Sequence, residues 1–277
     1  MFDQAFKLRE YYKSNAVERG SRQQIISVTS GKGGTGKSFV AFYVAQLLAK
    51  QGHKTLLVEF DFNLASLTYH LGINPDNTLF DFFDGKILFE ELPQKIFENF
   101  EVVLGDNGRL NYTDNNIAGI RNFFNSLYSK GNEYDFVIID NGAGISHEIF
   151  ETLKFSTFNL LVTLPDHVAV MDAYVVVKLM KKNSIDISNG VIVNKCKSIS
   201  EGKLAFENLN KAVNHFLKTE LNLMGILSED LHIKEPKILS ETSVNQTEIP
   251  EIISEISSVA LSIATFGQMA NNHQPAS

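Results

Sequence analysis

Short apolar runs alternate with longer, mostly amphipathic segments along the chain. The runs, rich in Val, Ile, Leu and Phe, predict strands over residues 25–29, 54–60, 100–104, 134–140, 158–164, 190–194 and 223–227. The segments between them predict helices over residues 39–49, 78–91, 115–129, 171–182 and 204–217. Because strand and helix alternate throughout, we predict the α/β class, with a single doubly wound, mainly parallel sheet and helices on both faces.

The two ends of the chain differ from this pattern, which divides it into residues 1–24, a domain over 25–267 and a disordered tail over 268–277. Residues 2–13 separate polar from apolar side chains as a helix does, and residues 15–24 suit a tether. So short a helix is marginal in isolation. It is either a frayed helix packed on its own domain or a detachable helix that a partner binds.

A last helix, opened by Pro250, carries an apolar stripe. A helix lying on a membrane would need Lys or Arg beside that stripe, and the chain has neither after Lys237. We therefore predict that this helix packs on the core, with membrane contact weak or made through a partner. The stripe consists of Ile252, Ile253, Ile256, Val259, Ala260, Ile263 and Phe266.

Composition narrows the class of protein. A net charge of −7 disfavours non-specific DNA binding. The single cysteine, Cys196, excludes a disulfide framework and a cysteine-ligated cluster built within one chain. The sequence has neither a signal-peptide core nor an apolar run long enough for a bilayer, so we expect a cytoplasmic protein.

The main chemical signal lies between the first strand and the first helix. Residues 31–38 read Gly-Lys-Gly-Gly-Thr-Gly-Lys-Ser, which fits the phosphate-loop pattern G-x-x-x-x-G-K-[S/T]. Glycines let backbone N–H groups point inward, and the helix N-terminus adds positive partial charge. Lys37 would reach the β- and γ-phosphates and Ser38 would ligate Mg²⁺. The flanking strand and helix favour nucleoside triphosphate binding over a glycine-rich turn with an incidental lysine.

Carboxylates follow two of the predicted strands. Glu59 and Asp61 stand at the end of one strand, and either could hold magnesium or orient the attacking water. Asp140 closes another strand and is placed to lie near the magnesium. The glycine-hinged residues 141–145 that follow are suited to move with the γ-phosphate.

A second lysine in the loop, Lys32, makes it resemble the deviant phosphate loop of the MinD/ParA (SIMIBI) ATPases. The resemblance covers about residues 25–266 and implies a dimeric enzyme that cleaves ATP to ADP and phosphate. In that family the signature lysine crosses an ATP-sandwich dimer and contacts the phosphates of the other subunit. The resemblance therefore implies catalytic roles for Lys32, Asp61 and Lys37. Cluster-bearing relatives are excluded by the single cysteine.

The same resemblance assigns further residues. Asp61 matches the aspartate that positions the hydrolytic water, and Asn194 matches the asparagine that reads the adenine. Asp172 matches an acid that pairs with the signature lysine in some members. The implied ATP ligands are Gly31, Lys32, Gly33, Gly34, Thr35, Gly36, Lys37, Ser38, Phe39, Asn194, Ser228 and Asp230. The implied magnesium ligands are Ser38, Asp61 and Asp140, and the implied dimer contacts are Lys32 and Asp172.

Three positions depart from the family pattern: Glu59 replaces an aspartate, Ser66 an asparagine and Ser228 a proline. The first two motivate an alternative hypothesis, a nucleotide-gated scaffold with little turnover. A division-site or plasmid-partition relative that binds membrane or DNA is a further alternative, disfavoured by the acidic charge and the tail without basic residues.

Three motifs resemble one branch of the family, FlhG (FleN), which regulates flagellar number. They are Asp-Gln-Ala-Phe-Lys-Leu-Arg at 3–9, Asn-Gly-Ala-Gly-Ile-Ser at 141–146, and Asp172-Ala173-Tyr174 with Lys178. In that branch the N-terminal helix stimulates an FlhF-type GTPase, so the resemblance implies partner-binding residues Asp3, Gln4, Ala5, Leu8 and Arg9. Flagellar basal-body or transcriptional partners, and an ATP-dependent homodimer, are implied in the same way.

Overall fold

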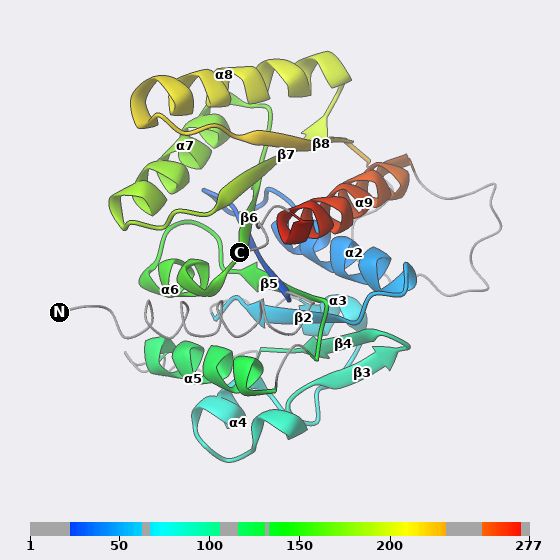
Figure 1. The fold of residues 1–277 in the computed structure, drawn as a ribbon. Coiled ribbons are helices and arrows are strands. Elements are labelled where there is room, and N and C mark those ends of the chain that lie inside the picture. Colours follow the sequence, from blue (N-terminus) through cyan, green and yellow to red (C-terminus); the bar gives the residue numbers. More distant parts are fainter. Residues whose placement is uncertain (1–22, 63–66, 106–115, 131–132, 231–250, 273–277) are drawn as a thin grey trace.

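The computed structural model describes residues 23–62, 67–105, 116–130, 133–230 and 251–272 (Figure 1). Ser66 and the predicted partner-binding residues lie outside the described residues. The latter are Asp3, Gln4, Ala5, Leu8 and Arg9.

A sheet of eight strands forms the centre of the described molecule, in the order β3-β4-β2-β5-β1-β6-β7-β8. All neighbouring strands are parallel except β3 and β4. This confirms the predicted mainly parallel sheet. The strands are β1 (Gln24–Thr29), β2 (Thr55–Phe60), β3 (Gln94–Phe97), β4 (Phe100–Val103), β5 (Phe136–Asn141), β6 (Phe158–Thr163), β7 (Ser188–Cys196) and β8 (Asn222–Ser228).

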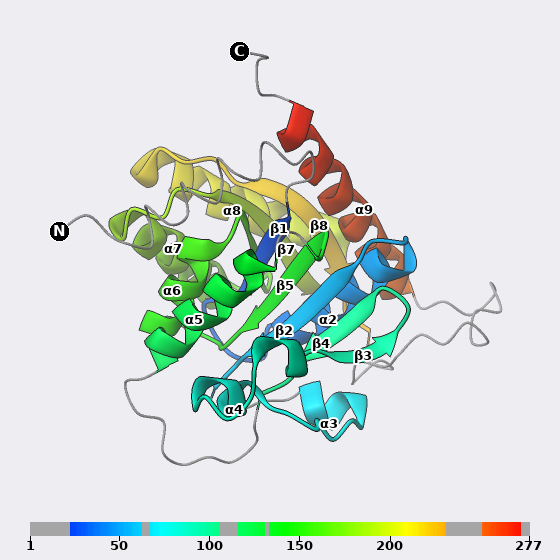
Figure 2. The same ribbon diagram turned by 60° about the horizontal axis from the view of Figure 1, so that its bottom comes forward.

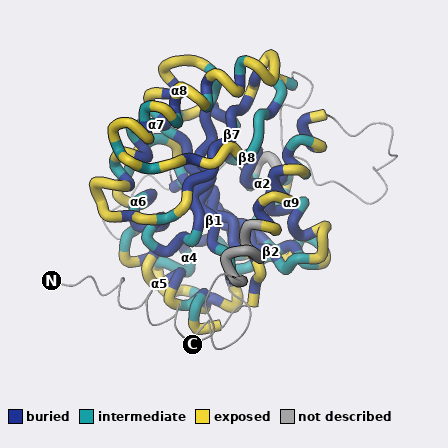
Figure 3. The backbone as a smooth tube through the Cα atoms, turned by 45° about the horizontal axis from the view of Figure 1, so that its top comes forward, coloured by how far each residue is buried: buried dark blue, intermediate teal, exposed yellow. Residues whose placement is uncertain are grey.

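Helices cover both faces of this sheet (Figure 2). Successive strand residues point to opposite faces, so Ile26 joins the core formed with α2 and α9, whereas Ile25 joins the core formed with α4 and α5. The inner strands β2, β5 and β6 are wholly buried between the layers (Figure 3). The helices are α2 (Lys37–Lys50), α3 (Leu67–Leu71), α4 (Leu79–Phe83), η1 (Phe89–Glu91), α5 (Asn116–Ser129), α6 (His147–Phe155), α7 (His167–Lys182), α8 (Ile199–Leu217) and α9 (Glu251–Asn272).

Residues 78–91 form two short elements instead of the single predicted helix, so that prediction was wrong. Thr78 and Asp81 form a reciprocal capping box at the start of α4. The helix stops after little more than a turn because Gly85 adopts φ +71°, outside the helical region. The chain then forms η1 and the edge strand β3, which the sequence pattern did not predict.

Side-chain caps set helix starts that apolar periodicity missed. The Asp166 carboxylate accepts from the backbone N–H of Ala169, so α7 begins at His167 and not at residue 171. Ser198 caps α8 in the same way, at Ile199 and not at residue 204. Ser146 caps α6, a helix that was not predicted.

The apolar stripe of α9 packs on the domain. Ile256, Val259 and Ala260 are fully buried in the core that contains α2. In Figure 1, α9 lies next to α2. The prediction of a core-packed helix is thus confirmed for the described part of the stripe. Among the described residues, no helix combines the length and apolar character needed to span a bilayer.

This packing predicts a large stability difference between two positions on α9. Ile256→Ala should lower the free energy of unfolding by about 2–4 kcal/mol, because it leaves a cavity in the core. Leu261 lies on the same helix and is 60% exposed, so Leu261→Ala is the matched control. It should lower the free energy of unfolding by less than about 1 kcal/mol. Urea unfolding measures both, and equal stability of the two variants would contradict the core role of α9.

Candidate nucleotide-binding site

The phosphate loop connects the end of β1 to the start of α2 in the middle of the sheet. β1 lies between β5 and β6, the kind of position where open α/β sheets bind ligands beyond the strand ends. Gly34 and Gly36 take φ +78° and +86°, which favour glycine. A Cβ on Gly31 would lie 2.4 Å from the carbonyl carbon of Asp172. Torsion and close approach therefore require these three glycines.

Lys37 lies at the start of α2 and forms a buried ion pair. Its Nζ lies 2.5 Å from Oδ1 of Asp140 on β5 and 3.3 Å from Oγ of Ser38. The side chains of Lys37 and Asp140 are 6% and 0% exposed. A buried charge without a partner is costly, so each of these two residues requires the other while no ligand is bound. The structure thus brings together three of the predicted site residues.

Two buried oxygens have no hydrogen-bond partner within the described part of the chain: Oδ2 of Asp140, which belongs to this pair, and Oγ1 of Thr35 in the phosphate loop. Buried polar atoms are normally satisfied, and exceptions often mark a site for a ligand, ion or water. Mg²⁺ usually takes one or two protein oxygens and completes its shell with phosphate and water. The Asp140 carboxylate and the Ser38 hydroxyl fit that requirement. No set of three or more His, Cys, Asp or Glu in the described ranges suits a metal held by protein alone.

Lys32 reaches across the loop to the start of α7. Its Nζ lies 3.3 Å from both oxygens of Asp166, and both side chains are partly exposed. The hydrogen bond from the backbone N–H of Ala169 is the main cause that holds the pKa of Asp166 below its usual value, and the Lys32 ammonium lowers this pKa further. Within this chain Lys32 therefore pairs with Asp166 and not with Asp172. A contact between Lys32 and Asp172 across two copies stays a prediction.

The two carboxylates at the end of β2 have different surroundings. Glu59 is buried, and its oxygens accept hydrogen bonds from the backbone N–H groups of Leu67 (2.8 Å) and Gly105 (3.2 Å). It therefore links the start of α3 to the chain just after β4. Asp61 is half-buried, and a Cβ on Gly142 would lie 3.6 Å from its Oδ1. Asp61 thus faces the loop that follows β5.

Asn194 and Ser228, which are predicted to bind the base, form hydrogen bonds with other residues of the chain. The buried amide of Asn194 donates to Thr35 O at 2.8 Å and accepts from the N–H of Lys195 at 2.8 Å. The N–H and hydroxyl of Ser228 both donate to Glu255 on α9. Phe39 packs its ring on Tyr43 in α2. Adenine contacts by Asn194, Ser228 and the half-buried Asp230 stay predictions.

Sequence reasoning missed Asp166, Lys195 and Glu255. An acid directly before an apolar helical run is an N-cap signal, which would have found Asp166. Lys195, near the end of β7, adopts φ +57° and contacts the loop through Gly34 O. Glu255 contacts Ser228 only through the packing of α9. Neither contact has a signal in the local sequence.

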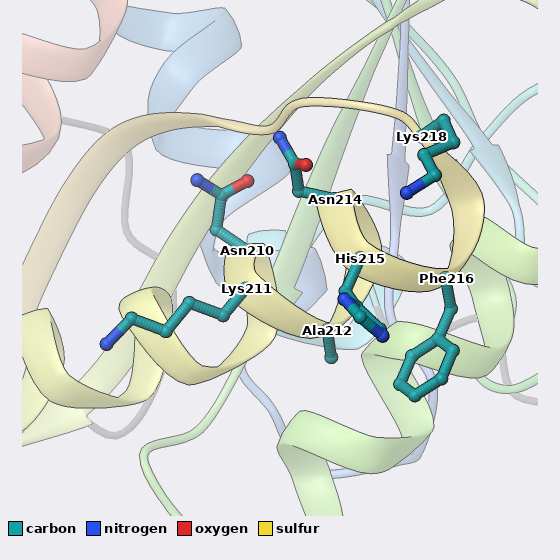
Figure 4. Close-up of a pocket in the computed structure, with 7 residues that line it drawn as sticks. All are labelled: Asn210, Lys211, Ala212, Asn214, His215, Phe216 and Lys218. Carbon is teal, nitrogen blue, oxygen red and sulfur yellow. The ribbon is translucent and has the colours of Figure 1, made fainter.

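The described surface also contains a hollow of about 640 Å³ at the end of α8 (Figure 4). None of the phosphate-loop residues lines it. Phe216, 69% exposed, lies beside His215 there and contacts Tyr174 of α7. The lining residues are Asn210, Lys211, Ala212, Asn214, His215, Phe216 and Lys218.

Comparison with known proteins agrees with this geometry. The family model described as the CobQ/CobB/MinD/ParA nucleotide binding domain matches residues 26–239. The flagellum site-determining protein YlxH of Helicobacter pylori is 29% identical over 231 residues, 80% of this chain and 76% of YlxH. The antiactivator FleN of Pseudomonas aeruginosa is 27% identical over 214 residues, 76% of this chain and 75% of FleN.

Solved structures show the same fold. The cell division ATPase MinD of Pyrococcus furiosus superposes with a TM-score of 0.71 at 25% identity, covering 88% of this chain and 100% of that one. MinD of Pyrococcus horikoshii, complexed with Mg-ADP, gives a TM-score of 0.71 at 24% identity, covering 90% and 98%.

The buried ion pair predicts a non-additive pair of substitutions. Lys37→Met should lower the free energy of unfolding of the nucleotide-free protein by about 3–5 kcal/mol, because it leaves the Asp140 charge buried without its partner. Adding Asp140→Asn removes that charge and should restore most of the loss. Denaturant unfolding of the two single variants and the double variant measures the coupling. A double variant no more stable than Lys37→Met would contradict the pairing.

Proposed function

Because the chain belongs to the CobQ/CobB/MinD/ParA nucleotide-binding family, we propose that it is an ATP-hydrolysing switch that dimerises with ATP and regulates the number or placement of flagella. The proposal that the protein binds a nucleotide rests on one observation. In the glycine loop, buried Lys37 pairs with Asp140, and buried oxygens of Asp140 and Thr35 have no hydrogen-bond partner within the described residues. The flagellar part is supported by the similarity to YlxH and FleN.

When ATP binds, the Lys37 ammonium would leave Asp140 and pair with the phosphates. In the structure its ammonium is satisfied by one carboxylate oxygen of Asp140 and the Ser38 hydroxyl. A triphosphate in the loop offers Lys37 a larger negative charge, and the loop N–H groups and the N-terminus of α2 favour the same anion. Asp140 and Ser38 would then hold Mg²⁺. When bound, this ion neutralises phosphate charge.

Hydrolysis requires an oriented water and additional positive charge. The water oxygen bonds to the γ-phosphorus as the bond to the bridging oxygen breaks; the electron pair leaves with ADP, and the water proton passes to the released phosphate or to solvent. Asp61, beside the loop that follows β5, orients that water. Lys32 stabilises the developing charge in the neighbouring subunit, as an arginine finger does.

Lys32 must leave Asp166 to cross between subunits. Their ion pair is partly exposed, so it is weak enough to break. Asp166 remains bonded to Ala169 when Lys32 departs, so the start of α7 keeps its cap. The exchange therefore leaves the fold of the subunit intact.

The partners follow from the resemblance to the flagellar branch. We assign the engagement of an FlhF-type GTPase to Asp3, Gln4, Ala5, Leu8 and Arg9, which lie outside the described residues. The ATP-bound dimer would present its surface to flagellar basal-body or transcriptional partners.

The switch predicts a nucleotide-dependent change of size. The unaltered protein should be a monomer with ADP and a dimer with ATP, and Asp61→Ala should stay dimeric with ATP because it cannot position water. Lys32→Ala should lose the dimer and reduce phosphate release by about 10²- to 10³-fold. Size-exclusion chromatography with light scattering and a phosphate-release assay measure these results. Lys203→Ala, an exposed lysine on α8, is the matched control.

Two outcomes would contradict the scheme. If the unaltered protein binds ATP but stays monomeric, the dimer switch is wrong. If it dimerises but releases no phosphate above background with or without a partner GTPase, a nucleotide-gated scaffold replaces the enzyme.

A further inference from the structure

We propose that Lys195 is a positioning residue for the phosphate loop. Together with Asn194 it holds two successive carbonyls of the loop, so that the N–H groups of the same two peptides face the phosphates. The inference rests on the proposed nucleotide binding and deepens it, because it identifies what holds the loop in its binding form.

The hydrogen bonds form a ladder between the end of β7 and the loop. Lys195 Nζ donates to Gly34 O at 2.9 Å, and Asn194 Nδ2 donates to Thr35 O at 2.8 Å. In a trans peptide the carbonyl and the following N–H point in opposite directions. Fixing these two carbonyls therefore orients the N–H groups of Thr35 and Gly36 the other way, toward the inside of the loop.

Lys195 also holds Asn194 in place. Its own N–H donates to Asn194 Oδ1 at 2.8 Å. Lys195 reaches both contacts from φ +57°, a conformation that is uncommon for residues other than glycine and persists where surrounding contacts hold it. The packing is close, because a Cβ on Gly36 would lie 2.3 Å from Asn194 Nδ2. The two residues thus act on the loop as one unit.

The chemistry of this contact separates it from base recognition. A residue that orients loop N–H groups affects every ligand with a polyphosphate, with or without a base. A residue that contacts the base affects nucleotides alone. A residue that contacts phosphate directly changes affinity without changing the loop of the nucleotide-free protein.

The test compares Lys195→Met with Lys195→Arg, which keeps a hydrogen-bond donor. The matched control is Lys197→Met, because Lys197 is an exposed lysine two residues further along the chain. Calorimetric titration of the full chain with Mg–ADP and with Mg–tripolyphosphate measures affinity. Hydrogen exchange of a peptide covering residues 31–38 reports the loop without ligand. Thermal unfolding checks that each variant is folded.

Lys195→Met should weaken binding of both ligands by the same factor, about three- to tenfold, as expected for one lost hydrogen bond. It should also speed exchange in the loop, whereas Lys195→Arg and Lys197→Met should behave like the unaltered protein. Unchanged tripolyphosphate affinity in Lys195→Met, or weaker affinity with unchanged exchange, would overturn the inference and leave the proposed function standing. If the unaltered protein binds neither ligand, the proposed function fails and the inference fails with it.

Discussion

The ion pair between Lys37 and Asp140 is the interaction on which the site depends. Both charges are buried near the ends of the central strands β1 and β5, and burying either charge without the other would cost several kcal/mol of stability. Their pairing satisfies the lysine and only one oxygen of the carboxylate. The protein therefore keeps a buried ammonium ready for an anion and a buried carboxylate oxygen ready for a cation. Magnesium triphosphate supplies both, which is why the arrangement supports the proposed ATP switch.

Sheet topology brings these groups together from distant parts of the chain. β1 and β5 are parallel neighbours, with Val28 opposite Asp140, so the loop after β1 and the carboxylate on β5 meet at one edge. Other elements hold the loop from outside: the backbone of α7 at Asp172, and the end of β7 at Asn194. Glu59 braces the neighbouring connections through backbone N–H groups. The loop is thus set by contacts among several elements as well as by its own glycines.

Much of this could be predicted from sequence because the signals are local. Apolar runs located the inner strands, and the motif from Gly31 to Ser38 located the loop; the resemblance to the MinD/ParA family and its flagellar branch is confirmed by the comparisons. Helix starts were missed where a single cap such as Asp166 or Ser198 decides them, and residues 78–91 because Gly85 interrupts an otherwise helical pattern. The partner of Lys32 and the contacts of Lys195 arise from tertiary packing, which the periodicity of apolar residues does not predict.

A crystal structure of the chain with magnesium and a non-hydrolysable ATP analogue tests the central claim most directly. The account predicts Lys37 Nζ within hydrogen-bonding distance of a phosphate oxygen, with Asp140 turned toward the metal and the Lys37–Asp140 bond broken. An analogue bound elsewhere, with Lys37 still 2.5 Å from Asp140, would contradict it.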